Sequence, residues 1–181
     1  MKKKRIEVGV KIDNLITTLN SPIPKNSAAE PIYLDSREGS KIYRHTFCFV
    51  ISMAAKELFP DRRLIIGNTI GSSFTFYFDG INDMSEVELE ALNNKLKEII
   101  DKNEPITSRE ISYQAAEKLF KENSMIGASQ LLMTINDPFV KISECRGYSD
   151  IAHNTLYPST GILKYYNLLS YKGGFVVQFP K

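Results

Sequence analysis

The stretch Ile42 to Pro60, with the sequence IYRHTFCFVISMAAKELFP, decides the fold of this chain of 181 residues. Its apolar residues recur at intervals of three and four, which is the spacing of a helix that buries one face in a core. Pro60 ends the predicted helix, and Ser40 is the expected cap at its start. His45 lies on the second turn, with Cys48 three residues later on the same side. Such a histidine is either a functional group or a packed ring with a hydrogen-bond partner, and both interpretations stay open.

The composition indicates a folded protein that does not depend on charge for its partners. Hydrophobic residues make up 43% of the chain, and the formal net charge is only +2, which argues against an obligate nucleic-acid binder whose affinity comes from neutralising phosphates. Weak RNA contact stays compatible with this charge. No apolar run is long enough for a membrane helix, which predicts a soluble, cytoplasmic protein. With two cysteines and two histidines, a zinc site would need nearly all of them, and no metal site is expected.

The rest of the chain predicts an α+β fold with a mostly antiparallel sheet, because helices and strands follow one another without a regular βαβ rhythm. In residues 74–79, three phenylalanines alternate with Thr75, Tyr77 and Asp79, which predicts a strand with a core face and a face that lines a groove. Ser85 and Glu88 form a capping-box pattern that opens a helix. The expected helices are residues 85–102 and 112–122, and the expected strands are residues 6–12, 15–19, 32–34, 74–79, 130–135, 139–145, 150–152 and 175–179.

A resemblance to a known family enters at Ile42–His45, at Ala55–Pro60 and again at Tyr157–Gly161. These segments resemble the second additional domain of threonyl-tRNA synthetases, and residues 6–34 are similar to the back half of the TGS (β-grasp) domain that precedes it. The resemblance implies a mostly antiparallel sheet packed with a long central helix and further helices. It also divides the chain into a partial TGS-like segment, residues 1–36, and an additional-domain-like region, residues 37–181.

In those synthetases the domain is an editing hydrolase that removes serine from mischarged tRNA, with an HxxxH pair and a CxxxH pair. Carried over by this resemblance, His45 stands at the first histidine, and Asp150 matches an aspartate of the pattern. Phe49, Ala152 and Leu156 stand at the other three positions, and their side chains cannot bind a metal or move a proton. One histidine and one carboxylate do not make an editing site.

Longer strings are similar to the N-terminal region of bacterial uridine kinase-like nucleoside kinases, at Ile42–Arg44, Phe47–Phe49, and residues 57–64, 158–164 and 174–180. That resemblance implies a P-loop kinase domain as a partner, in the same polypeptide or in trans. The phosphate-binding pattern GxxxxGK[ST] is absent from this sequence, so the family name would be that of a transferase while this chain is not expected to be catalytic by itself. No cofactor is expected here, and ATP and Mg only with a downstream kinase domain.

These resemblances lead to one functional hypothesis and one alternative. The first is a non-catalytic accessory or regulatory region of a uridine kinase-like protein, whose degenerate editing-type groove binds a small ligand or, weakly, tRNA. The expected groove residues are His45, Phe49, Thr75, Tyr77, His153, Ser159 and Thr160. The alternative is a hydrolase of aminoacyl esters that works without metal, in which His45 acts as base with Cys48 or Asp150 near it. His45 and Asp150 are the weak catalytic candidates of this alternative.

Overall fold

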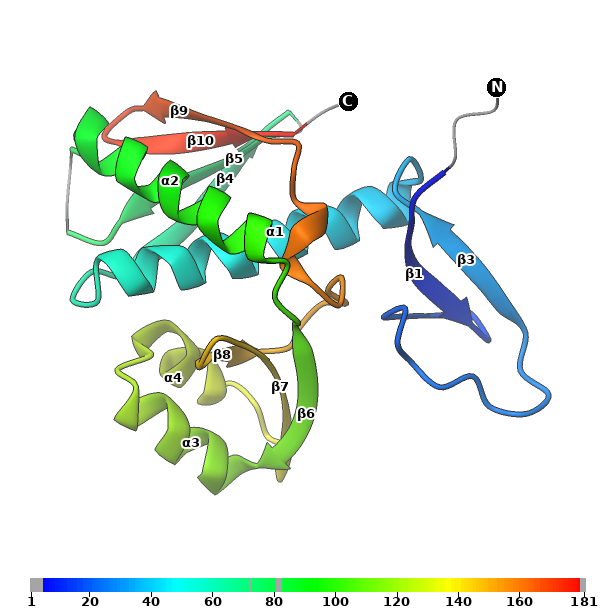
Figure 1. Ribbon diagram of the computed structural model, residues 1–181. Helices are drawn as coiled ribbons and strands as arrows, with labels where there is room; N and C mark the ends of the chain where they lie inside the picture. The colour runs from blue at the N-terminus through cyan, green and yellow to red at the C-terminus, as the bar shows by residue number, and fades with distance from the viewer. Residues whose placement is uncertain (1–4, 72, 81–82, 180–181) are drawn as a thin grey trace. The chain divides into compact units, whose positions relative to one another are not determined.

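The computed structural model describes residues 5–71, 73–80 and 83–179. The chain divides into two compact units, the first made of residues 1–46 and 104–159 and the second of residues 47–103 and 160–181. Helices combine with antiparallel sheets in both, which confirms the predicted α+β class (Figure 1). The units interleave along the chain, whereas the division into 1–36 and 37–181 follows chain order and stays a prediction. Of the basic start of the sequence, residues 1–4 lie outside the described residues.

Helix α1 (Arg37–Leu58) is the predicted central helix, but it begins earlier than the apolar pattern indicates. Ser36 is the residue that caps it, because its Oγ accepts a hydrogen bond from the Gly39 amide at 3.0 Å. The expected cap, Ser40, lies inside the helix. Gly39 packs so closely on the carbonyl of Tyr33 that any Cβ there would collide with it. The first turn of α1 is polar, so the spacing of apolar residues could not indicate where the helix begins.

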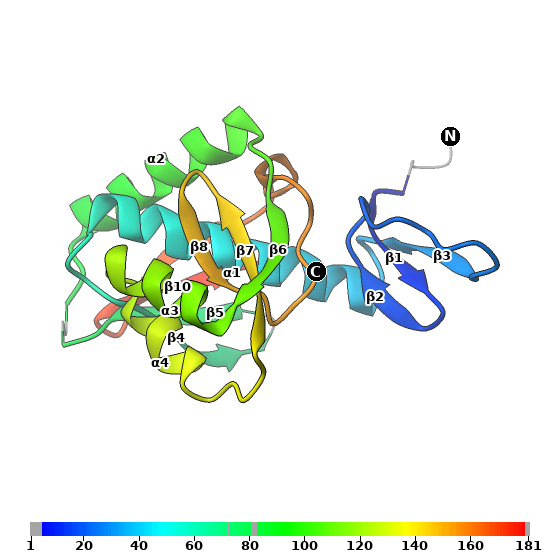
Figure 2. The same ribbon diagram turned by 90° about the horizontal axis from the view of Figure 1, so that it is seen from below.

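In the first unit, three short strands form a sheet in the order β2-β1-β3, as predicted from residues 6–34. The strands are β1 (Glu7–Ile12), β2 (Leu15–Thr17) and β3 (Ala29–Tyr33), all antiparallel (Figure 2). Val8 and Ile32 are buried, and Ile42 of α1 reaches the backbone at Gly9. A three-stranded sheet this small needs a packing partner, and here the start of α1 supplies one.

The same unit holds a second antiparallel sheet, β6-β7-β8, formed by β6 (Thr107–Ser112), β7 (Phe139–Cys145) and β8 (Tyr148–Ile151). Helices α3 (Tyr113–Glu122) and α4 (Ile126–Leu132) pack on one face of it (Figures 1 and 2). Their shared core is formed by Ala116, Phe120, Met125, Ala128, Leu132, Val140, Ile142 and Ile151.

One prediction for this part of the chain is wrong. Residues 130–135 were expected to form a strand, but residues 130–132 are the end of α4, which buries Ala128 and Leu132 at a helical spacing. A short apolar run fits a buried helix as well as a strand, so its period could not decide. Thr107 and Glu110 have the spacing of a capping box in the sequence, but they lie in β6, and Ser112 caps α3.

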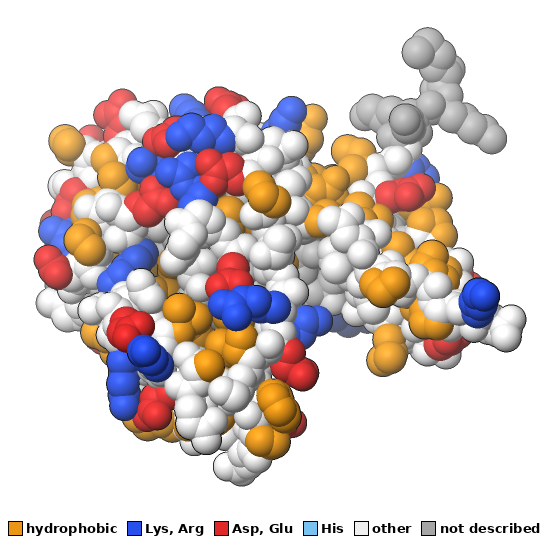
Figure 3. All heavy atoms as spheres, turned by 60° about the horizontal axis from the view of Figure 1, so that its bottom comes forward, with side chains coloured by type: hydrophobic (Ala, Val, Ile, Leu, Met, Phe, Trp, Pro, Cys, Tyr) orange, Lys and Arg blue, Asp and Glu red, His pale blue; other side chains and the backbone are white. Residues whose placement is uncertain are grey.

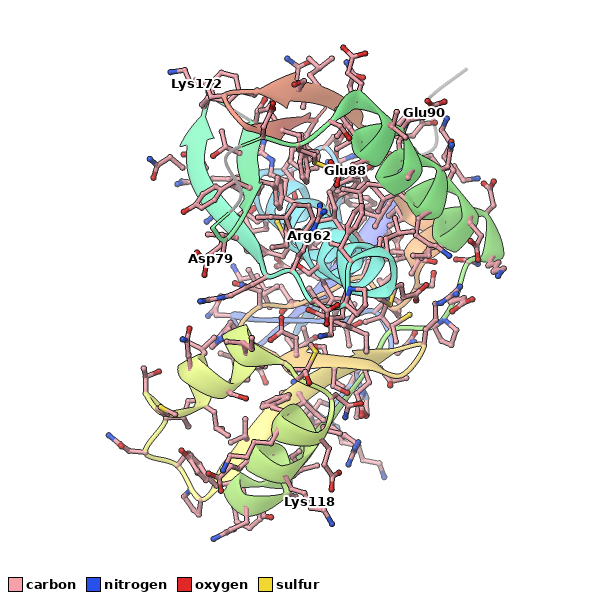
Figure 4. The ribbon with its side chains drawn as sticks, turned by 90° about the vertical axis from the view of Figure 1, so that its left-hand side faces the viewer. Arg62, Asp79, Glu88, Glu90, Lys118 and Lys172 are labelled. Carbon is pink, nitrogen blue, oxygen red and sulfur yellow. The ribbon has the colours of Figure 1, made fainter. Side chains whose placement is uncertain are left out.

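The second unit is a four-stranded antiparallel sheet with two helices on one side. Its strands are β4 (Leu64–Ile70), β5 (Ser73–Phe78), β9 (Asn167–Tyr171) and β10 (Gly174–Gln178), in the order β4-β5-β10-β9. A short 3-10 helix, η1 (Thr160–Ile162), precedes β9. Figure 4 shows the sheet on the left, with α2 (Glu86–Lys102) and the later part of α1 on the right.

The predicted alternation in residues 74–79 is confirmed within this unit. Phe76 and Phe78 are buried, and the ring of Phe78 packs on that of Phe59 just beyond α1, with centroids 5.3 Å apart. The predicted capping box of α2 is also present: Ser85 Oγ accepts the Glu88 amide hydrogen, and the Glu88 carboxylate accepts the Ser85 amide hydrogen at 2.9 Å. These two signals position the sheet and the helix that covers it.

Among the described residues, no helix combines the length and the apolar character that crossing a membrane requires.

Candidate functional site

A polar cavity of about 520 Å³ lies in the first unit, between the β2 hairpin region and the segment that follows β8. Hydroxyl and amide side chains dominate its lining, which is the composition of a site that recognises a ligand by hydrogen bonds. The lining residues are Ile16, Thr17, Thr18, Asn20, Ser21, Pro22, Ile106, Thr107, Ser108, Lys141, Ala152, His153, Asn154, Thr155, Leu156 and Pro158. Its volume is that of a small-molecule site.

The segment 152–158 forms one wall of the cavity and is held by hydrogen bonds to distant parts of the chain. Thr155 donates its hydroxyl hydrogen to the carbonyl of Ile16 at 3.0 Å. The amide of Ala152 donates to the Lys141 carbonyl at 2.9 Å, and Ile106 donates to the Pro158 carbonyl at 2.9 Å. These bonds anchor the segment at its start, middle and end, so the wall is preformed.

Thr46 of α1 adds a further anchor to this wall. It is completely buried, and its Oγ1 accepts the Tyr157 amide hydrogen at 2.9 Å while donating to the Ile42 carbonyl at 2.7 Å. Because Tyr157 stands between two lining residues, Leu156 and Pro158, α1 helps to fix the wall.

A row of polar side chains crosses the β6-β7-β8 sheet on the face opposite to its apolar core. Ser108 and Ser143 share a hydrogen bond between their hydroxyls at 3.1 Å, and Ser143 is paired in register with Asp150. Burial raises the pKa of Asp150, although its carboxylate accepts the Ile151 amide hydrogen at 2.8 Å and interacts electrostatically with His153, both of which lower this pKa. Ser108 lines the cavity, so this row continues its polar wall into the sheet.

The structure places the two predicted histidines differently. His153 lines the cavity, whereas His45 does not. His45 is half-buried on α1, and its pKa is lowered first by burial and then by the charges of Lys41 and Arg44. Both causes favour the neutral form of the ring.

The remaining expected groove residues are divided between the two units. Ser159 belongs to the first unit, where it bridges to Pro105. Thr160 lies in the second unit, and its buried hydroxyl donates to the Ile99 carbonyl at 2.8 Å, so this group is used within the fold. The expected groove as a whole stays a prediction.

Three further residues of the expected groove belong to the second unit, one on helix α1 and two on strand β5. Phe49 is buried on α1. Thr75 and Tyr77 lie on the face of β5 opposite to the phenylalanines that face the helices, and Tyr77 is 44% exposed. Within this unit the structure does not bring these two side chains to the helix side of the sheet.

Two observations bear on the reactive groups that the sequence offered. Burial raises the pKa of the Cys48 thiol to about 12, so this thiol stays protonated and is a poor nucleophile near neutral pH. Within residues 5–71, 73–80 and 83–179, no cluster of three or more His, Cys, Asp or Glu side chains could hold a metal ion.

Sequence reasoning missed most of the cavity. Thr107 and Ser108 come from β6 and Lys141 from β7. Thr17 is the last residue of β2, and Thr18, Asn20, Ser21 and Pro22 follow that strand. The signal present in the sequence is the segment 154–161, whose Asn, Pro, Ser and Gly residues are typical of a loop.

Comparison with known proteins finds relatives among the threonine–tRNA ligases. No family model matches the sequence. Among curated proteins, it is similar to threonine–tRNA ligases: 32% identical over 158 residues to that of Desulfovibrio desulfuricans, 28% over 166 residues to that of Desulforamulus reducens, and 29% over 171 residues to that of Thermotoga neapolitana. These matches cover 87%, 91% and 93% of this chain but only 24%, 26% and 26% of the respective ligases. The chain thus spans about a quarter of the length of these relatives.

These relatives confirm the predicted likeness to threonyl-tRNA synthetases and correct the finer interpretation. The expected accessory region of a uridine kinase-like nucleoside kinase is wrong, and so is the P-loop kinase domain expected as its partner, because the relatives are tRNA ligases. The descriptions nucleoside kinase and transferase are likewise not supported by these relatives. The similarity to the ligases runs through nearly the whole chain.

Proposed function

We propose that this chain is a tRNA-binding region of the threonine–tRNA ligase type, and that its polar cavity receives the single-stranded 3′ end of a tRNA. The observation that carries the proposal is the hydroxyl- and amide-lined cavity beside residues 152–158, in a chain similar to threonine–tRNA ligases. Recognition of single-stranded RNA ends uses hydrogen bonds to base edges and to the 2′-hydroxyl, and such groups are what this cavity offers.

The charge of the site supports an end-binding role over broad contact with a duplex. Lys141 is the lysine of the lining, and His153 is its other titratable group. Because affinity for duplex RNA comes mainly from many phosphate contacts, a cavity with one lysine favours contacts to sugar and base. The small net charge of the chain, +2, agrees with this.

Filling the cavity tests the proposal. Ala152 lines the wall, so Ala152→Phe places a ring in the space that the RNA end would occupy. The matched control is Ala115→Phe on the exposed side of α3, which adds the same ring away from the cavity. Binding is measured by fluorescence anisotropy with a tRNA that accepts threonine and with the same tRNA lacking its single-stranded 3′ end, after circular dichroism shows that both variants are folded.

We expect the intact tRNA to bind at least about tenfold more tightly than the truncated one. Ala152→Phe should remove this preference, and Ala115→Phe should keep it. Equal affinity of the unmodified protein for both RNAs, or a preference that survives Ala152→Phe, would contradict the proposal.

A further inference from the structure

A second hollow, of about 390 Å³, lies in the second unit between α2 and the segment that leads into β9. Figure 1 shows this orange segment beside the end of α2. The hollow is distinct in residues and in compact unit from the polar cavity described above. The side chains that give it chemical character are Asn93, Lys97, Asp101, Lys164, Tyr166 and Asn167.

The lining is rich in hydrogen-bond donors and carries more positive than negative charge. Lys97 and Lys164 are both exposed, and neither makes a salt bridge to any residue that the structure describes. Asp101 is the carboxylate of the lining. Two ammonium groups against one carboxylate leave a net charge of about +1 in a concave site.

Fixed neighbours orient the amide part of this lining. Tyr166 donates its hydroxyl hydrogen to Asn93 Oδ1 at 3.1 Å, which leaves the Nδ2 group of Asn93 as a donor. The ring of Tyr166 is held in turn against Phe47, with centroids 4.8 Å apart. One amide donor is thus preset, and the lysines supply mobile cationic donors.

We propose that this hollow binds a phosphate group of an RNA backbone, as a second contact of the tRNA whose end enters the polar cavity. The inference rests on the proposed function for its ligand. Phosphate oxygens accept charge-assisted hydrogen bonds from lysine and ordinary ones from amide groups, and such contacts fix the register of a nucleic acid without reading its sequence. The net charge of about +1, from Lys97 and Lys164 against Asp101, matches the charge of about one backbone phosphate.

The salt dependence of tRNA binding tests this inference. Each phosphate that a protein neutralises contributes about 0.7–0.9 to the slope of log affinity against log salt concentration. The double variant Lys97→Ala with Lys164→Ala should lower this slope by about 0.7–0.9 and weaken binding at low salt by roughly threefold to tenfold. Asp101→Asn should tighten binding, because it removes the opposing charge.

The matched control removes the same charge elsewhere. Lys118→Ala with Lys121→Ala takes two lysines from α3, where they pair with Glu122 and Glu117. This control should leave the slope unchanged. An equal fall of the slope in both double variants would show an effect of net charge alone and would overturn the inference.

Repeating the titrations with the tRNA that lacks its 3′ end separates the two proposals. A slope change that persists on the truncated RNA supports the phosphate site whether or not the 3′ end is recognised. If the 3′-end preference is present but the slope does not depend on Lys97 and Lys164, the phosphate site is overturned and the proposed function stands. If the preference is absent while the slope depends on both lysines, the proposed function falls alone.

Discussion

Replacing Thr46 by valine should loosen the wall of the polar cavity without disturbing the helix that carries it. Valine has nearly the shape of threonine but no hydroxyl, so the Tyr157 amide hydrogen loses its acceptor, which now stands 2.9 Å away. The bond from Thr46 to the Ile42 carbonyl is a local one within the helix, and its loss contributes little.

The magnitude follows from the burial of the partners. An unsatisfied buried donor costs about 1–3 kcal/mol, and Tyr157 is half-buried, so the lower part of this range applies. We expect opening of the segment around Tyr157 to become easier by about 1.5 kcal/mol, which is roughly a tenfold faster amide exchange. The urea midpoint should fall by a matching amount with an unchanged m-value.

Hydrogen exchange followed at the Tyr157 amide by NMR is the direct assay, and Thr46→Ser is the control because it keeps the hydroxyl. The serine variant should retain the protection of Tyr157 even though it loses a buried methyl group. If the valine and serine variants exchange this amide at the same rate, the hydrogen bond from Thr46 does not hold the wall, and the account of a preformed cavity would need a different anchor.

Three further predictions address groups outside the cavity. The Ser85 amide and then Arg62 hold the pKa of Glu88 at about 2, below its ordinary 4.5, so its contribution to stability is present above pH 4.5 and lost as the pH falls toward 2. Glu88→Gln should therefore show a smaller fall of the melting temperature over this pH range than the unmodified protein does. Cys48, with a pKa raised to about 12, should react with iodoacetamide at pH 8 far more slowly in the folded protein than in urea. Phe120→Ala should lower the free energy of unfolding by about 3–5 kcal/mol in urea titrations, because Phe120 is completely buried between α3, α4 and their sheet, and a loss under 1 kcal/mol would contradict that packing.

Local signals predicted the parts of the fold that depend on local chemistry. The capping box at Ser85 is a bond pattern between residues three apart, and the structure contains it as expected. Phe76 and Phe78 alternate with Thr75 and Tyr77 because a strand turns successive side chains to opposite faces. Each of these features is complete within one stretch of sequence.

The predictions that were wrong concern features that depend on tertiary packing and not on local sequence. Leu131 and Leu132 read equally well as part of a strand or of a helix, and the burial of Ala128 and Leu132 against the β6-β7-β8 sheet settles the matter. The start of α1 was misplaced because Gly39 and Ser36 owe their roles to the backbone of Tyr33, a contact that no periodicity shows.

The same distinction explains why the candidate site was found only in part. Ala152 and Leu156 were noticed because a family pattern assigns chemistry to their positions, and both do line the cavity. The opposite wall comes from residues 16–22. The hydrogen bond from Thr155 to the Ile16 carbonyl connects the two walls, although these residues are 139 positions apart in the sequence. The cavity exists only where the two walls come together in the folded chain. Each wall, taken from its own stretch of sequence, has only the pattern of a polar turn. Recognition by scattered hydroxyl groups leaves no spaced motif, whereas metal or nucleophilic chemistry would, because its groups must converge on one atom. A binding site of this type is therefore compatible with a sequence that contains no motif, and the sequence could not reveal where the site lies.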